Sequence, residues 1–389
     1  MHRAPVARLM DAWICGFNRS PFTPAHKGEL RHVRPDEMLG QVVAECLKRT
    51  GLTGSDVDDI QIGCAYPEGE QGLNIGRIAT YLSGCPVEVP GMTTNRLCGS
   101  SMQVVHTAAG QIARGWGDII LCGGVESMSR IKRGGFSRSP HPDLHTRFPD
   151  AYISMGETAE NVADMCSIGR VRQEEFALAS HQKASAALAE GSYSDAIIAI
   201  ESSDGTIGTD GCIRAESTLE AMAVLRPAFR DGGSVTAATS SPLTDGAVCL
   251  IIASDAAVEK HGLKPMSRIL SAAVTGCEPR EMGLGPIAAS RLALKRAGLA
   301  MRDIDVIELN EAFASQSLAV IDRLGLDSEK LNVDGGALAI GHPLGASGAR
   351  LLGRAATVLR RTSGRYALAT MCIGGGMGIA TVLETFPVA

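Results

Sequence analysis

The sequence lacks any Cys-x-x-Cys pair and any apolar run near the ~18 residues that a membrane-spanning helix requires. Its 11 cysteines, an odd number, and its nine histidines are scattered singly. Neither a disulfide framework nor a metal site is therefore predicted. The start, residues 1–5, also lacks the apolar core and cleavage site of a secretory signal. Together these absences favour a soluble protein in a reducing, cytoplasmic compartment without membrane attachment.

Positive charge is not in excess either. The net charge is −5, and no block of five or more like charges occurs, so nucleic-acid binding is not supported. Hydrophobic residues make up 45% and charged residues 20%, which is typical of a soluble globular protein. A length of 389 residues argues for more than one domain-sized unit, because single cores stop growing near ~250–300 residues.

Secondary structure is predicted from periodicity and end signals. Residues 35–50 form the clearest helix, with Pro35 at its start, acidic residues in the first turn, basic residues in the last, and Gly51 at its stop. Strands are predicted at 12–17, 56–64, 119–122 and 247–253, and further helices near 156–168 and 172–190. Gly123 and Gly124 are expected to close the third of these strands.

The end of the chain repeats its beginning. Residues 47–52 (LKRTGL) match 294–299 (LKRAGL), and 56–60 (DVDDI) match 303–307 (DIDVI), both at an offset of 247 (294 − 47). Residues 121–124 further resemble 371–375, which pairs Cys122 with Cys372 at an offset of 250 (372 − 122). Three matches in one order indicate a duplication. Alternation of strands and helices predicts a mainly parallel sheet in each half, covered on both faces.

Cys98 stands between an apolar run and a helix whose buried face begins at Met102. Ser100 and Ser101 are typical cap residues for its start. A thiol at a helix N-terminus can have a pKa below the usual ~8.5. The alternative is a small buried cysteine that packs as a hydrophobe. A duplicated fold would bring Cys98 near the loops at 310–313, 341–343 and 372–376, which favours the reactive alternative.

Four blocks resemble the signatures of the thiolases, which are acyl-CoA C-acyltransferases. They are NRLCGSSM (95–102), NEAFA (310–314), GGALAIGHPLGASGAR (335–350) and CIGGGMG (372–378). The resemblance covers nearly the whole chain and implies an α/β fold of five layers, α-β-α-β-α. That fold has two similar halves, each with a mixed sheet, and an inserted loop subdomain.

Domain boundaries follow from the repeat and from a change in composition. The N-terminal half is predicted at 1–124 and 234–262, and the C-terminal half at 263–389. Residues 125–233 are richer in charge and loop signals, and are predicted to form an inserted subdomain. The thiolase resemblance implies that this subdomain binds coenzyme A (CoA).

The resemblance also implies catalytic roles. Cys98 would carry the acyl group, His342 would serve as its base, and Cys372 would act as the second acid/base. One oxyanion hole would use His342 with a water held by Asn310, and the other the backbone N–H groups of Cys98 and Gly374. The alternatives are a loop histidine for His342, a buried strand-end residue for Cys372, and an ordinary glycine-rich turn.

Substrate contacts are implied in the same way. The residues aligned with CoA or acyl-group contacts are Ser241, Arg214, Phe229, Met155, Met282, Ala312 and Phe313. For the methionines and phenylalanines the alternative is core packing. CoA would be a co-substrate, with no permanently bound cofactor and no metal. The implied assembly is a homodimer or homotetramer, with a hydratase/dehydrogenase complex as a further option.

Two departures bear on specificity. Ser154 stands where acetoacetyl-type thiolases often have His, and Asp334 stands where Asn is usual. The resulting prediction is a 3-ketoacyl-CoA thiolase of fatty acid β-oxidation that forms an acyl-cysteine. Four alternatives remain: an acetoacetyl-CoA-forming acetyl-CoA acetyltransferase, a 3-oxoadipyl-CoA thiolase, a ketoacyl synthase, and a non-catalytic CoA- or lipid-binding member of the family. Direction and chain length stay open.

Overall fold

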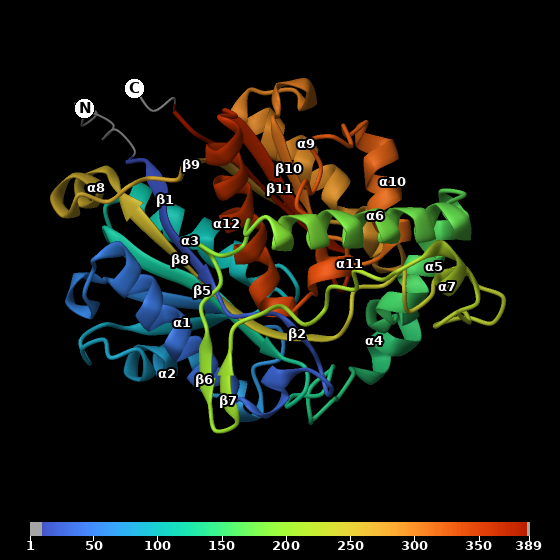
Figure 1. Ribbon diagram of the computed structural model, residues 1–389, viewed down its shortest axis with the longest axis horizontal. Helices are drawn as coiled ribbons and strands as arrows, with labels where there is room; N and C mark the ends of the chain where they lie inside the picture. The colour runs from blue at the N-terminus through green and yellow to red at the C-terminus, as the bar shows by residue number, and fades with distance from the viewer. Residues whose placement is uncertain (1–9, 387–389) are drawn as a thin grey trace.

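The computed structural model describes residues 10–386, which form two sheets joined edge to edge (Figure 1). With respect to the repeat, the strand order is mirrored: four strands of each half lie at equivalent places, and the first half has one further edge strand without a counterpart strand in the described part of the second. In sheet order the strands are β10 (Val306–Leu309), β11 (Tyr366–Ile373), β12 (Met377–Glu384), β9 (Ser267–Gly276), β1 (Ala12–Arg19), β8 (Thr244–Ser254), β5 (Ile119–Ser127), β3 (Asp59–Gly63) and β4 (Gly91–Thr94). The short β2 (Thr23–Pro24) pairs with β8.

The sheets are mixed, so the prediction of mainly parallel sheets is wrong. Only β3–β4, β3–β5 and β10–β11 are parallel among the named strands, while the remaining pairs of the main sheet are antiparallel. The reason is that β8 runs antiparallel to β5 in the first half, and β12 runs antiparallel to β11 in the second. The halves meet through a short pairing of β1 with β9, at Trp13–Arg268 and Ile14–Ser267.

Three hydrophobic cores separate five layers. The outer helices α1 (Pro35–Thr50) and α2 (Ile75–Leu82) cover one sheet, and α9 (Gly285–Ala297) and α10 (Ala314–Leu324) cover the other. The central layer holds α3 (Ser100–Ala113) and α12 (Leu344–Thr362), whose apolar side chains share one core with both sheets. The five-layer α-β-α-β-α fold is thus confirmed.

The repeat is visible in individual hydrogen bonds. Asp58 accepts the backbone N–H groups of Asp118 and Ile119 at 2.7 and 2.9 Å, and Asp305 accepts those of Arg365 and Tyr366 at 2.8 and 3.0 Å. All three positions are shifted by 247 (305 − 58). The sheet keeps this offset, since Asp59 pairs with Ile120 and Val306 with Ala367.

The counterpart of Cys372 is therefore Val125, and the match of Cys122 with Cys372 is wrong. Gly123 and Gly124 also do not end β5, which continues to Ser127. A Cβ on Gly123 would lie 2.3 Å from the Val248 carbonyl oxygen. One on Gly124 would lie 2.2 Å from a carbonyl oxygen of α12. These glycines are inside the strand because other backbone approaches them closely.

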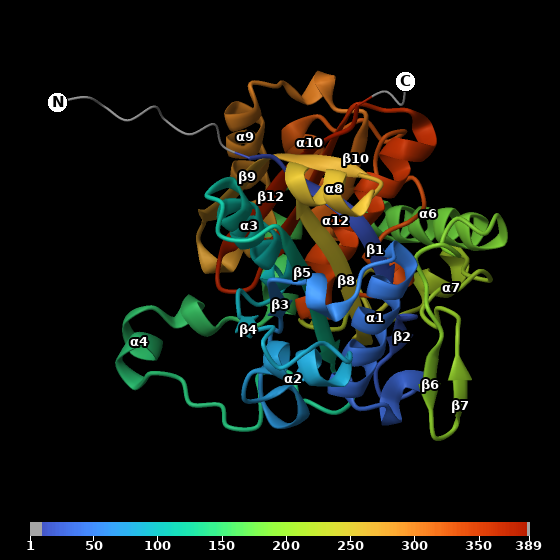
Figure 2. The same cartoon turned by 90° about the vertical axis from the view of Figure 1, so that its left-hand side faces the viewer.

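Between β5 and β8 lie α4 (Pro142–Arg147), α5 (Met155–Met165), α6 (Arg170–Ala189), β6 (Ile200–Ser202), β7 (Gly205–Ile207) and α7 (Leu219–Ala223). The helix α8 (Asp255–His261) follows β8, and in the second half α11 (Ala337–Ile340) precedes α12. Figure 2 shows α4 and its flanking loops standing away from the body. By contrast, α5 and α6 pack on α10 and α11 of the second half. The predicted domain boundaries stay a prediction.

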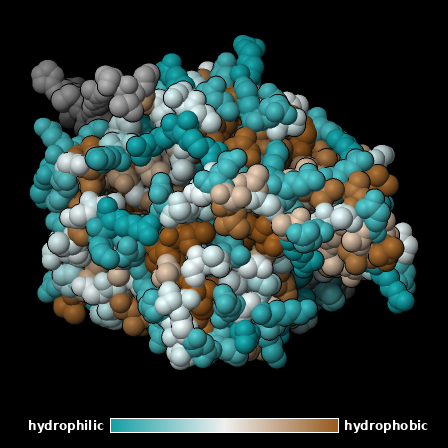
Figure 3. All heavy atoms as spheres, viewed as in Figure 1, coloured by the Kyte–Doolittle hydropathy of each residue, from teal (hydrophilic) through white to brown (hydrophobic). Residues whose placement is uncertain are grey.

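One helix has the bounds and end signals that the sequence predicts. The helix at 35–50 has the predicted bounds, and Gly51 ends it with a left-handed φ of 74°. The surface face in Figure 3 mixes polar and apolar residues, with apolar ones gathered near its middle. No helix within residues 10–386 is long and apolar enough to cross a membrane.

Candidate active site

Cys98 lies in a strained turn between β4 and α3. Leu97 has a left-handed φ of 45°, which costs a non-glycine residue roughly 1–2 kcal/mol. Its neighbours hold it there: its N–H donates to Asn95 Oδ1 at 2.8 Å, and its carbonyl accepts from Ser100 Oγ at 2.6 Å. The turn thus fixes the residue before the thiol. Gly99 is the N-cap of α3, so Ser100 and Ser101 lie inside the helix.

The predicted lowering of the Cys98 pKa is not observed. Burial raises the pKa of the Cys98 thiol to about 11, the N–H of Gly374 lowers it, and the carboxylate of Glu126 raises it further. The first N–H groups of α3 do not favour the thiolate enough to offset this burial. Those of Gly99 and Ser100 are already bonded to the carbonyls of Arg96 and Leu97, at 3.0 and 3.1 Å.

His342 lies in the loop between α11 and α12 and is buried. Its Nε2 is 3.4 Å from Asn310 Nδ2, and its Nδ1 is 2.5 Å from Ser347 Oγ. Burial, and then the charge of Arg350, lowers the pKa of His342 to about 3. The imidazole is therefore neutral near pH 7, as a base that accepts the thiol proton must be.

Asn310 follows β10 and is fully buried, with its backbone N–H bonded to the Thr370 carbonyl at 3.0 Å. Its Oδ1 has no hydrogen-bond partner within the protein. Buried polar atoms are usually paired with protein or water. An amide with a free oxygen beside His342 can therefore hold a water molecule, which is the arrangement that the thiolase resemblance implies.

Cys372 is the second-last residue of β11 and is 2% exposed. Burial, and then the neighbouring Cys98 thiol, raises its pKa. The apolar side chains of Met155, Met282 and Phe313 pack around it. Next to it, Gly374 reaches the cysteine turn: a Cβ there would lie 3.1 Å from Leu97 Cδ1. Cys98, in a turn of the first half, and Cys372, near the end of a strand of the second, therefore lie near each other.

The predicted substrate contacts form a connected wall. Both the N–H and Oγ of Ser241 donate to the Ala312 carbonyl at 3.0 Å. The rings of Phe229 and Phe313 meet edge to face at 5.9 Å. Arg214 lies further along, on a cavity of about 200 Å³ that Ser240 also lines. The chain thus brings Ser241, Ala312, Phe229 and Phe313 together, with Arg214 beyond them.

Sequence reasoning missed the buried carboxylate of Glu126. Its Oε2 accepts the N–H groups of Ala65 and Gly345 at 2.9 and 3.0 Å. Ala65 in turn accepts from Asn95 at 3.0 Å, in the turn of Cys98, while Gly345 begins the helix after His342. Glu126 therefore ties the loops of both catalytic candidates together. A charged residue inside an apolar glycine-rich strand was the available signal.

The two departures from the thiolase pattern have structural partners. Ser154 Oγ accepts the N–H of Glu157 at 3.3 Å and so caps α5. Asp334 is buried and pairs with Arg354 and Arg361 of α12. Asp334 therefore carries a buried ion pair that an asparagine would not form.

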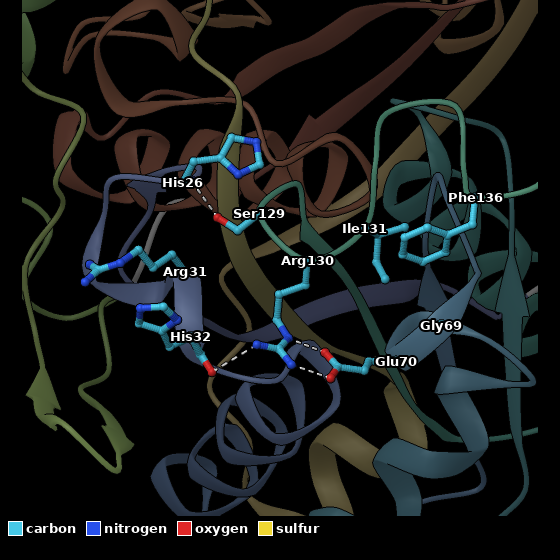
Figure 4. A pocket seen from close by; sticks show the side chains of 9 residues that line it. All are labelled: His26, Arg31, His32, Gly69, Glu70, Ser129, Arg130, Ile131 and Phe136. Atoms are coloured by element: carbon cyan, nitrogen blue, oxygen red, sulfur yellow. Dashed lines mark hydrogen bonds and ion pairs between the residues drawn. The ribbon is translucent and has the colours of Figure 1, made fainter.

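A larger cavity of about 460 Å³ lies elsewhere and contains none of the predicted site residues (Figure 4). His26, Arg31 and His32 line one part of it, and Arg130, which pairs with Glu70, donates to the His32 carbonyl at 3.4 Å. Its volume does not identify it as the reaction site. No cluster of three or more His, Cys, Asp or Glu side chains suited to a metal occurs in the described part of the chain.

Comparison with known proteins matches this geometry. Residues 12–256 match the thiolase N-terminal domain and residues 263–385 the thiolase C-terminal domain. A 3-ketoacyl-CoA thiolase of Bacillus subtilis is 42% identical over 97% of this chain and its own full length. Two solved structures are each 36% identical over 97% of this chain. They are the Bacillus anthracis acetyl-CoA acetyltransferase (TM-score 0.90, 100% of that chain) and human mitochondrial 3-ketoacyl-CoA thiolase in complex with CoA (TM-score 0.89, 98% of that chain).

Proposed function

Because the chain belongs to the thiolase family, we propose that it is a 3-ketoacyl-CoA thiolase. It cleaves a 3-ketoacyl-CoA with CoA to give acetyl-CoA and a shortened acyl-CoA, or runs the reverse condensation. Two observations carry this proposal: the Cys98 and Cys372 thiols lie near each other, and Asn310 Nδ2 lies 3.4 Å from His342 Nε2.

Acyl transfer begins at Cys98. His342 takes the thiol proton, and the sulfur attacks the 3-keto carbon. With the pKa of the thiol at about 11 and that of the imidazole at about 3, the free enzyme holds both groups neutral. Proton transfer therefore accompanies attack on bound substrate, when the developing alkoxide takes over the negative charge.

The alkoxide is held by the backbone N–H groups of Cys98 and Gly374. The nearness of Gly374 to the cysteine turn supports this assignment. Breaking the C2–C3 bond leaves acyl-Cys98 and the enolate of acetyl-CoA. His342 and a water on Asn310 stabilise that enolate oxygen, and Cys372 protonates its carbon. The raised pKa of Cys372 supports the role, since the thiol keeps its proton until it is donated.

CoA then accepts the acyl group. Its pantetheine arm runs along the wall of Ser241, Ala312 and Phe313, with its nucleotide toward Arg214. The connected contacts of these residues support this path, as does the CoA complex of the similar human thiolase.

An acetoacetyl-CoA-forming acetyltransferase is the second candidate, favoured by the likeness to the Bacillus anthracis enzyme. A 3-oxoadipyl-CoA thiolase is a third. Ser154 favours the leading assignment over the acetoacetyl type, because it caps a helix and carries no imidazole into the acyl pocket. We further propose a cytoplasmic homodimer or homotetramer, alone or with a hydratase/dehydrogenase partner.

The test is a Cys98→Ala variant assayed for CoA-dependent formation of acetyl-CoA from 3-ketoacyl-CoA substrates of increasing chain length. We expect activity to be abolished while thermal unfolding stays that of a folded protein. The control is Cys166→Ala, a partly exposed cysteine that makes none of the site contacts described here. Turnover in Cys98→Ala near the wild-type rate would refute the mechanism. A wild-type preference for the shortest substrate would favour the acetoacetyl type.

A further inference from the structure

A second buried carboxylate, Glu311, lies directly after Asn310 and takes no part in the chemistry above. It is 2% exposed, and every hydrogen bond that it accepts comes from a neutral donor. Ser180 Oγ donates at 2.6 Å, Asn332 Nδ2 at 2.7 Å, and the backbone N–H of Leu338 at 3.2 Å. Burial raises the pKa of Glu311, and the hydrogen bonds from Ser180, Asn332 and Leu338 act to lower it, because they favour the ionised carboxylate, which accepts all three without presenting a donor.

The side chain of Asn332 bonds to the two residues next to Asn310 in the chain, Leu309 and Glu311. Its Oδ1 accepts the N–H of Leu309 at 2.9 Å, while its Nδ2 donates to the Leu309 carbonyl at 2.9 Å and to Glu311. The side chain therefore acts like a neighbouring strand along residues 309–311. Asn332 itself has a left-handed φ of 42°, a conformation that Asn tolerates better than most residues.

The other end of Glu311 holds the segment that leads to His342. Its contact with Leu338 lies in α11, which ends immediately before Gly341 and His342. Ser180 completes the link, since its Oγ also accepts the N–H of Gly336 at 3.1 Å. A Cβ on Gly336 would lie 2.1 Å from the Glu311 carboxylate carbon, so a side chain there would displace it.

We propose that Glu311 is a positioning residue that sets the distance between Asn310 and His342, with Asn332 and Ser180 as its supports. It acts through those two side chains and does not touch substrate. The inference rests on the proposed function, in which that pair stabilises the enolate. C–C bond cleavage, the step that forms this enolate, then depends on a hydrogen-bond network that reaches from β10 to α6 of the inserted segment.

The test is Glu311→Gln, which places an NH₂ group among three donors while keeping size and shape. Two reactions are measured on each variant. C–C cleavage of 3-ketoacyl-CoA needs the Asn310 side of the site. Exchange of labelled CoA into acetyl-CoA needs acyl transfer through Cys98, with His342 as its base, but forms no enolate and so does not need the water held by Asn310. We expect cleavage kcat to fall about 10- to 100-fold, since a misplacement of ~1 Å can cost about 100-fold, and exchange to change less than about threefold.

Matched variants separate positioning from general damage. Glu384→Gln alters another buried carboxylate, on β12, and should leave both reactions unchanged. Asn332→Asp sets a second carboxylate against Glu311. A shared proton would restore that contact, so cleavage should recover as pH falls from 8 to 6. Ser180→Ala is the milder change, should Glu311→Gln fold poorly, and should lower cleavage more than exchange.

Equal loss of both reactions in folded Glu311→Gln or Ser180→Ala would overturn the proposal, as would wild-type cleavage. Absence of cleavage in the wild type would instead refute the proposed function. In that case crystal structures of the wild type and Glu311→Gln decide the positioning role: it predicts a changed Asn310–His342 distance, and an unchanged one contradicts it.

Discussion

At the scale of single residues, burial governs the site more than local sequence does. A helix N-terminus ordinarily favours a thiolate, yet the Cys98 pKa is raised to about 11 because the thiol is desolvated and Glu126 lies near. His342 is held neutral by the same cause. Cys98 and His342 are therefore both neutral before substrate binds, and the nucleophilic thiol keeps its proton.

This makes alkylation of Cys98 strongly dependent on pH. Below a pKa of about 11 the thiolate fraction rises tenfold for each pH unit. The rate of modification by iodoacetamide, followed by mass spectrometry, should therefore rise about tenfold per unit from pH 7 to 9. Cys98→Ala gives the background from other cysteines. A rate that levels off below pH 8 would contradict the raised pKa.

Substitutions of Cys372 and of Cys98 should slow different steps of the reaction. Replacing Cys372 with Ser removes the thiol that protonates the enolate carbon but leaves the acyl carrier. We expect Cys372→Ser to slow C–C bond cleavage by about 100-fold or more, in the range that acid–base catalysis contributes. Labelled CoA exchange should stay within a few-fold of wild type. Equal losses in the two assays would remove Cys372 from its assigned step.

How far sequence could predict the site follows from these residues. Four catalytic candidates lie in the sequence blocks that resemble the thiolases, so their roles could be named by resemblance. They are Cys98, Asn310, His342 and Cys372. Glu311 is in one of these blocks and Asn332 lies just before another, but their importance depends on which donors surround them after folding. The positive φ of Leu97 left no signal either, because the bonds that hold it come from Asn95 and Ser100 only once the turn exists.

At the scale of elements, the sequence predicts the ends of a helix, because the residues that cap it are next to it in the chain. The helix at 35–50 has its predicted bounds because its caps are next to it in sequence. Strand direction depends on partners far along the chain, so the alternation of strands and helices suggested mainly parallel sheets, and only the thiolase resemblance implied mixed ones. The glycines of β5 were read as a strand end because their close contacts, with β8 and α12, are distant in sequence.

The central helices α3 and α12 pack through a glycine. A Cβ on Gly348 would lie 2.5 Å from the backbone nitrogen of Met102. Gly348→Ala must therefore push the helices apart, and we expect the free energy of unfolding to fall by roughly 1–3 kcal/mol, measured with urea, together with kcat. Gly110→Ala is the control on α3, where nothing lies within 4 Å, and should be neutral or stabilising. A neutral Gly348→Ala would mean that the layer is not tightly packed.

At the scale of the whole molecule, few polar contacts cross from the central layer to a sheet. His106 of α3 makes one, with its Nε2 2.8 Å from Thr381 Oγ1 of β12, in the other half. Burial, followed by the charges of Arg96 and Arg296, lowers the pKa of His106 to about 4. Protonating it in the folded protein is therefore unfavourable.

Because of His106, the folded protein loses stability as pH falls. Between the ordinary pKa of 6.5 and about 4, the unfolded chain binds a proton that the folded chain does not, so His106 costs stability as pH falls through this window. From pH 8 to pH 5, wild type should lose about 2 kcal/mol more unfolding free energy than His106→Gln. Urea unfolding at each pH measures this. The exposed His145→Gln serves as control, and parallel wild-type and His106→Gln profiles would contradict the assignment.

The mirrored strand order has a consequence for synthesis of the chain. β1 finds its partner β8 only after the inserted segment, since Ala12 pairs with Ser254, 242 positions later (254 − 12). Nor can β5 complete its pairing before β8 is made. A chain emerging from the ribosome therefore carries two unpaired strand edges until it is well past its midpoint. Such edges invite association with other chains, so this fold depends on protection of its first half during translation.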